Sequence, residues 1–169
     1  MTRWVDVSPE YCPEPTAEDC ACLLRNGIEG VIVGGSYSRP ELVRKFLATF
    51  AAAGLRTGVY GFIEYTSPFP YAALYRALSA SRGTGISLFI VDAELGVGVL
   101  GGAAVVDLTR EGVRRAETEL PGVEVLPYTA GWWWGPATER SHETFGRRAV
   151  LAQYTADPDL EPDPARLTP

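Results

Sequence analysis

The sequence has few cysteines and a single histidine, which removes several kinds of site from consideration. The three cysteines, Cys12, Cys20 and Cys22, are odd in number, and their spacing fits neither a disulfide framework nor a zinc site. We therefore expect no metal and thiols packed as small apolar side chains, with a bridge from Cys12 to Cys20 or Cys22 left open. The histidine, His142, lies in a polar stretch, so we expect a surface position and no Ser-His-Asp grouping.

The sequence also lacks a long hydrophobic run and a basic stripe. No apolar segment is long enough to span a membrane, and the N-terminal residues contain no signal-peptide core. Only Lys45 is a lysine, and the formal net charge is −6. This acidic balance argues against nucleic acid and anionic membranes as partners. We expect synthesis in the cytoplasm, and action outside it only after release by another protein.

Short apolar runs alternate with amphipathic stretches along the chain of 169 residues, which is long enough for one domain. The expected strands are 3–8, 30–35, 57–66, 87–94, 123–131 and 149–155. The expected helices begin at Thr16, at a Ser38–Glu41 capping box, near Pro70 and near Thr109 behind an Asp107 cap. We expect the domain to span 1–156, followed by an extended acidic and proline-rich tail over 157–169.

This alternation predicts an α/β fold with a parallel sheet. Two arrangements are compatible with it, an open doubly wound sheet and a (β/α) barrel. In both, ligands bind at the carboxyl ends of the strands.

Acidic residues fall at these strand ends. In the stretch LFIVDAEL, Asp92 and Glu94 follow a buried run, and because they are two residues apart in a strand they point to the same face. Asp6 ends the first strand, and Glu64 follows the third. We therefore expect these carboxylates to converge at one edge of the sheet.

Paired carboxylates beside aromatic side chains suit glycoside hydrolysis, in which one acid gives a proton and another stabilises the positive sugar ring. Crowding and apolar walls raise the pKa of one member of such a pair. The alternative is that these acids cap helices or pair with arginines. Aromatic residues near this edge are Tyr60, Phe62, Tyr65, Tyr128, Trp132, Trp133, Trp134 and Tyr154.

Substrate contacts are expected from Tyr60, Phe62, Glu64, Tyr128, Trp132 and Tyr154. The segment GWWWG is either a sugar platform or a buried corner of the core. The glycine-rich turns VGGS and GVGVLGG match no nucleotide-binding motif, so no cofactor is expected.

Five motifs in order resemble the family-25 glycoside hydrolases, which are N-acetylmuramidase lysozymes. They are VDVS, FAAAGLRTGVYGF, VDAEL, YT in VLPYTAGWW and AQYT. The resemblance implies a TIM-like (β/α) barrel that cleaves the glycosidic bond after N-acetylmuramic acid in a peptidoglycan strand, as phage endolysins do. It implies that Glu94 is the general acid/base, Asp92 its assisting carboxylate, Asp6 a supporting acid and Tyr60 a wall residue.

The sequence departs from that family in three places. Gly61 replaces the histidine of a Tyr-His-Phe motif, the segment VIVGGSYSRPE lacks the family's lysine and glutamate, and the family's final strand has no counterpart. We therefore expect an irregular or incomplete barrel, or a partner chain that completes it. Two alternative functions follow, a glycan-binding module without turnover and a structural assembly protein.

Overall fold

One parallel sheet organises the chain. The computed structural model describes residues 3–95, 100–130, 133–134, 137–138 and 149–152. The strands are β1 (Trp4–Val7), β2 (Gly30–Gly34), β3 (Arg56–Glu64), β4 (Leu88–Leu95), β5 (Glu124–Ala130) and β6 (Val150–Ala152). The helices are α1 (Ala17–Arg25), α2 (Pro40–Ala52), α3 (Ala72–Ser81) and α4 (Gly102–Glu119). Residues 157–169 and His142 lie outside the described residues.

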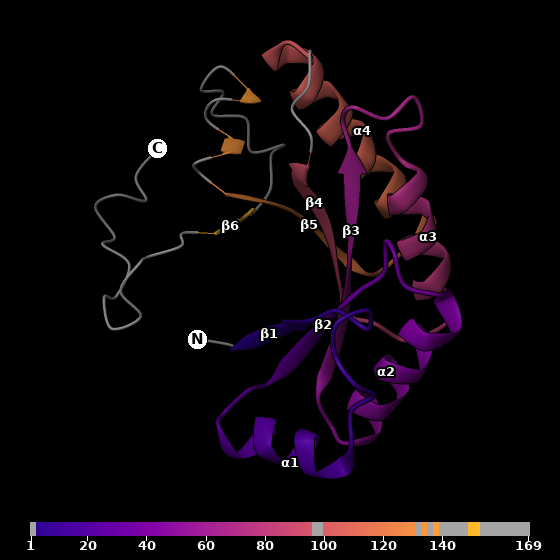
Figure 1. Ribbon diagram of the computed structural model, residues 1–169, viewed down its shortest axis with the longest axis vertical. Coiled ribbons are helices and arrows are strands. Elements are labelled where there is room, and N and C mark those ends of the chain that lie inside the picture. Colours follow the sequence, from indigo (N-terminus) through magenta and orange to yellow (C-terminus); the bar gives the residue numbers. More distant parts are fainter. Residues whose placement is uncertain (1–2, 96–99, 131–132, 135–136, 139–148, 153–169) are drawn as a thin grey trace, which may run out of the picture.

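The strands lie in the sheet in sequence order, β1 to β6, and each described pair is parallel. When the strands lie in the sheet in sequence order and every crossover between them has the same hand, all the helices lie on one face of the sheet. In a doubly wound sheet the strand order reverses part-way, so helices lie on both faces. Figure 1 shows α2, α3 and α4 along one side of the sheet. The winding is therefore that of a barrel, and the expected α/β class is confirmed.

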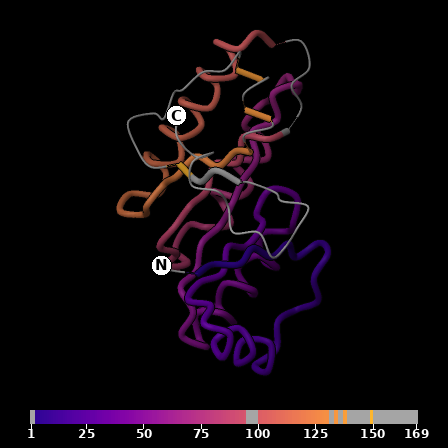
Figure 2. The backbone as a smooth tube through the Cα atoms, turned by 90° about the vertical axis from the view of Figure 1, so that its left-hand side faces the viewer, coloured from indigo at the N-terminus to yellow at the C-terminus, as the bar shows by residue number. Residues whose placement is uncertain are grey.

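The barrel is not closed by the described strands. β1 and β6 form the two edges of the sheet, and neither pairs with the other. Figure 2 shows the elements following one another along the long axis of the molecule, from the N-terminal half to α4. α2, α3 and α4 cover one face of the sheet, and none of these three helices lies on the opposite face, which would be the interior of a closed barrel (Figure 1).

The alternation of side chains in β4 explains the stretch LFIVDAEL. Phe89, Val91 and Ala93 point to the helical face, where each is completely buried. The intervening residues, among them Asp92 and Glu94, point to the opposite face. Acidic residues can follow a buried run in this strand because its two faces have different surroundings.

The start of α1 agrees with expectation, whereas the start of α2 differs from it. Thr16 caps α1 with a box that it shares with Asp19, in which its hydroxyl accepts from the Asp19 backbone N–H at 3.2 Å. The expected Ser38–Glu41 box is absent, because Arg39 occupies the cap position of α2 and makes no side-chain capping bond. Ser38 is instead buried, and Pro40 supplies the pre-organised first turn.

Helix α4 begins at Gly102, seven residues before the expected Thr109. The expectation that Asp107 caps this helix is therefore wrong, and Asp107 pairs within the helix with Arg110 at 2.6 Å. Packing decides this extension, since Val105 is completely buried in the core. None of the helices in the described part of the chain combines the length and apolarity that a membrane span requires.

The three cysteines are free thiols. Cys20 is buried in the core, as expected of a small apolar side chain, but Cys12 and Cys22 are exposed. Helical geometry explains the difference within α1, since residues two apart face different sides of a helix.

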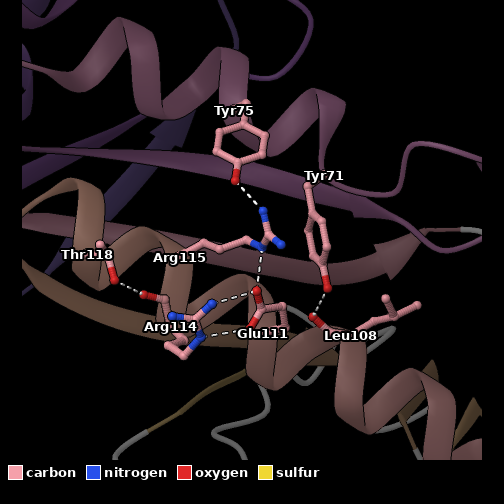
Figure 3. Close-up of polar contacts among 7 residues, drawn as sticks. All are labelled: Tyr71, Tyr75, Leu108, Glu111, Arg114, Arg115 and Thr118. Carbon is pink, nitrogen blue, oxygen red and sulfur yellow. Dashed lines mark hydrogen bonds and ion pairs between the residues drawn. The ribbon is translucent and has the colours of Figure 1, made fainter.

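An arginine cluster joins α3 to α4 (Figure 3). The Arg115 guanidinium lies 4.7 Å from the Tyr71 ring centroid and donates to the Tyr75 hydroxyl. Glu111 orients it through an ion pair of 2.7 Å and also binds Arg114. The Tyr71 hydroxyl donates to the Leu108 carbonyl at 3.0 Å, so the two helices are fixed side by side on the covered face.

Candidate active site

The open face of the sheet contains a hollow of about 380 Å³. Its lining residues come from β1 to β5 and are Trp4, Val5, Asp6, Ile32, Tyr60, Phe62, Ile90, Asp92, Glu94 and Tyr128. The three carboxylates expected to converge, Asp6, Asp92 and Glu94, line this one hollow together with three of the expected aromatic residues.

Strand register places aromatic rings on both sides of Asp92. Its Cα is paired with that of Phe62 in β3 and with that of Tyr128 in β5. Side chains at paired positions of a parallel sheet point to the same face, so the three form a row across it. The carboxyl of Asp92 therefore lies between an apolar ring and a phenol.

Glycines in β2 provide space for two further rings. A Cβ on Gly30 would overlap the Trp4 ring, and a Cβ on Gly34 would come within 2.6 Å of the Tyr60 hydroxyl oxygen. The Trp4 and Tyr60 rings thus lie directly against the β2 backbone. A larger residue at either glycine would displace a wall of the hollow.

The hollow strongly perturbs the titration of Asp92. Burial is the main cause and the negative charges of Glu94 and Asp6 add to it, together raising the pKa of Asp92 to about 8. The side chain is 7% exposed, and its Oδ1 has no hydrogen-bond partner among the described residues. At neutral pH this carboxyl therefore holds a proton in the resting protein.

Glu94 occupies the next position outward on the same face. Burial raises the pKa of Glu94, and a hydrogen bond from Tyr128 opposes that rise. Its Oε1 is buried without a partner in the described part of the chain. The site thus presents two neighbouring carboxyls that retain protons to higher pH than ordinary acids do, which is the property that general acid catalysis requires.

Glu64, expected to contact substrate, does not line this hollow. Its Cα is paired with that of Leu95, after a register shift that places one more residue in β4 than in β3 between this pair and the Phe62–Asp92 pair. Beside this shift, the Ser36 hydroxyl oxygen accepts a hydrogen bond from the Phe62 backbone N–H at 2.7 Å. Glu64 is directed instead to the Tyr37 hydroxyl, which donates to it at 3.2 Å.

Several aromatic residues expected near the sugar lie in the core. Tyr65 is 3% exposed, and its ring centroid is 5.4 Å from that of Trp133. Trp133 is itself buried, and Trp134 packs against the same core cluster. Trp133 and Trp134 of the segment GWWWG therefore belong to a buried corner of the core. Trp132 and Tyr154 lie outside the described residues.

Trp4, Ile32 and Ile90 line the hollow but were not singled out from the sequence. Strand periodicity was the available signal, since Trp4 is two residues before Asp6 and Ile90 is two residues before Asp92. Within the described ranges, no group of three or more His, Cys, Asp or Glu residues has the geometry to hold a metal ion.

Gly61 departs from the family-25 pattern for a packing reason. It points to the helical face, where an added Cβ would come within 2.7 Å of the Ala77 Cβ in α3. A histidine side chain has no room at this position. This departure concerns the contact between β3 and α3, and it leaves the lining of the hollow unchanged.

No family model matches the sequence, and a search of curated proteins finds no match. Among solved structures the chain is similar to the crystal structure of GH5_18 from Streptomyces cattleya in complex with GlcNAc, with a TM-score of 0.56 and 12% sequence identity. The likeness supports an α/β fold with barrel-like winding, which the described strands leave open. The match covers 76% of this chain and 44% of the neighbour, so the chain spans less than half of that protein. At this identity the likeness concerns the fold alone.

Proposed function

We propose that the protein is a glycoside hydrolase and that the hollow holds the sugar at the bond to be cleaved. The observation that carries the proposal is the Asp92–Glu94 pair, two acids of raised pKa on one face of β4 between aromatic walls. Amphipathic rings such as Tyr60 and Tyr128 suit a sugar, which has an apolar face and a polar rim. The fold of the GH5_18 neighbour supports the same class of reaction.

In the proposed reaction Glu94 is the general acid/base. Its proton passes to the glycosidic oxygen as the bond from that oxygen to the anomeric carbon breaks. Water then adds its hydroxyl to the anomeric carbon, and its remaining proton returns to the Glu94 carboxylate. Asp6 stabilises the positive charge on the ring, and Asp92, deeper in the hollow, orients the substituent beside the reacting carbon.

The substrate we propose is peptidoglycan, cleaved after N-acetylmuramic acid. This finer assignment rests on the resemblance of VDVS and VDAEL to family-25 motifs, which implies that Asp6, Asp92 and Glu94 correspond to that family's acids. It is independent of the GH5_18 likeness.

The test measures new reducing ends after incubation of the purified chain with peptidoglycan. We expect release by the parent chain and a fall of about 10²- to 10⁴-fold in Glu94→Gln, the range typical of a lost general acid. Glu41→Gln, a matched change of an exposed residue on α2, is expected to retain activity. Equal release by Glu94→Gln and the parent would remove Glu94 from the mechanism.

A second candidate is a glycan-binding module without turnover. It is favoured by the open edges of the described sheet, because a one-sided hollow surrounds a bound sugar less completely than a closed barrel would and fixes its position relative to the catalytic acids less precisely. Binding of peptidoglycan without release, in both parent and Glu94→Gln, would support the module. Neither binding nor release would indicate a structural assembly role.

A further inference from the structure

A row of aromatic rings leads out of the hollow toward the loop after β2. The Tyr60 and Phe62 ring centroids are 5.5 Å apart, and those of Phe62 and Tyr37 are 5.7 Å apart. Tyr60 and Phe62 line the hollow, whereas Tyr37 lies beyond it and is 44% exposed. The row therefore extends from the hollow that contains the carboxylates to an exposed ring. The distance between neighbouring rings is comparable with the length of one pyranose residue.

Tyr37 is held in place although it is exposed. Its hydroxyl donates to Glu64 at 3.2 Å, and its ring packs against Phe62. Burial and the negative charge of Glu64 raise the pKa of Tyr37 to about 12, so the hydroxyl remains a donor throughout the working pH range. A ring fixed at both ends loses little side-chain entropy when a ligand stacks on it.

A polar notch lies beside this ring. It is lined by Ser8, Glu10, Gly34, Ser36, Tyr37, Ser38, Tyr60 and Phe62, and its volume is about 10 Å³. A notch of this size holds about one water-sized group. A sugar ring is too large for it, but a hydroxyl group projecting from a ring stacked on Tyr37 would fit.

We infer that Tyr37, Glu64 and this notch form a second carbohydrate subsite, which binds the sugar adjacent to the one held over Asp92 and Glu94. The inference rests on the proposed function. The ring of Tyr37 covers the apolar face of the sugar, and the carboxylate of Glu64 accepts a hydrogen bond from one of its hydroxyl groups. Its exposed ring, Tyr37, belongs to the segment VIVGGSYSRPE, where the sequence departs from the family-25 pattern.

The subsite makes affinity depend on the length of the glycan. A disaccharide is expected to bind mainly through the hollow, whereas a tetrasaccharide reaches Tyr37 as well. For Tyr37→Ala we expect about a tenfold loss of affinity for the tetrasaccharide and less than a twofold change for the disaccharide, because stacking is lost only outside the hollow. Tyr37→Phe keeps the ring and should stay within about threefold of the parent for both.

The experiment is calorimetric titration of the inactive Glu94→Gln background with purified peptidoglycan disaccharide and tetrasaccharide. Phe69→Ala, which removes another exposed aromatic ring outside both cavities, is the matched control. Circular dichroism of each variant confirms that it is folded. Equal losses for both glycans in Tyr37→Ala, or no loss for either, would overturn the subsite while leaving the proposed function standing.

Failure of the proposed function itself has a different signature. If the Glu94→Gln protein with Tyr37 unchanged binds neither glycan, both proposals are overturned. A chain that binds both glycans with equal affinity keeps the hollow as a sugar site and overturns only the subsite.

Discussion

Asp92 is the residue on which the chemistry of the open face depends. It is nearly buried, adjacent to two other acids and without a partner for one oxygen in the described residues. An isolated buried carboxylate is so unfavourable that the group retains its proton instead. A protonated acid in an aromatic hollow costs less to bury, and it is ready to donate a hydrogen bond to a ligand.

Asp92 also makes stability depend on pH. The pKa of the aspartic acid side chain is 3.8 in the unfolded chain, its ordinary value, and about 8 in the folded chain, so within that window the folded chain holds a proton that the unfolded chain releases. Raising the pH therefore favours unfolding. We predict that the unfolding free energy of the parent falls relative to Asp92→Asn by up to about 1.4 kcal/mol per pH unit between pH 4 and 8.

Urea unfolding of both proteins at pH 4.5, 6 and 7.5 measures this difference. Parallel curves for the parent and Asp92→Asn across the window would show that Asp92 is solvated and titrates normally in the folded chain.

At the scale of elements, β3 contributes residues to both the hollow and the contact with the helices. Its hollow face supplies Tyr60 and Phe62, and its helical face carries Gly61 against α3. Farther along the same strand, Glu64 accepts a hydrogen bond from the Tyr37 hydroxyl. One strand thus sets the wall of the hollow, the approach of a helix and the support of the proposed second subsite.

We predict that Gly61→Ala destabilises the protein by about 1–3 kcal/mol, because its methyl group overlaps the Ala77 Cβ and the well-packed helix cannot withdraw freely. Ala77→Gly alone should cost about 1 kcal/mol through lower helix propensity. The double variant should cost less than the sum of the two. Additive losses, measured by thermal unfolding, would exclude a steric contact between these positions.

At the scale of the whole molecule, the sheet is covered on one side only. The core lies between the sheet and the helices, and Ile32 on the opposite face is only half-buried. A closed barrel would bury both faces equally. The half-open arrangement provides access for a chain-like ligand, and it also provides a surface that a partner chain could cover.

Substitution of two isoleucines, one on each face of the sheet, tests whether the hollow is open to a ligand or covered by a partner chain. Ile63 is completely buried on the helical face, so Ile63→Ala should cost about 2–5 kcal/mol, whereas Ile32→Ala on the hollow face should cost about 1 kcal/mol or less. Urea unfolding at two protein concentrations measures both. Equal, concentration-dependent costs would indicate that a second copy covers the hollow in solution.

Much of the fold and part of the site could be predicted from the sequence, because they depend on local periodicity. Alternation along β4 places Asp92 and Glu94 on one face, and the order of strands and helices predicts parallel pairing. The start of α4 and the cap of α2 were missed, since tertiary burial of Val105 and Ser38 outweighs local capping preferences there.

The sequence by itself determined the parallel pairing of the strands and the edge of the sheet at which the carboxylates gather, since both follow from the order and spacing of residues along the chain. It left open whether the sheet is doubly wound or wound as a barrel, which the strand order of the structure decided. Only the tertiary structure decided that Asp92 is buried beside Glu94, that Tyr65 and Trp133 belong to the core, and that Glu64 holds Tyr37. These depend on strand register and on which face the helices cover. Contacts between residues distant in the sequence fix both, and no local pattern encodes them.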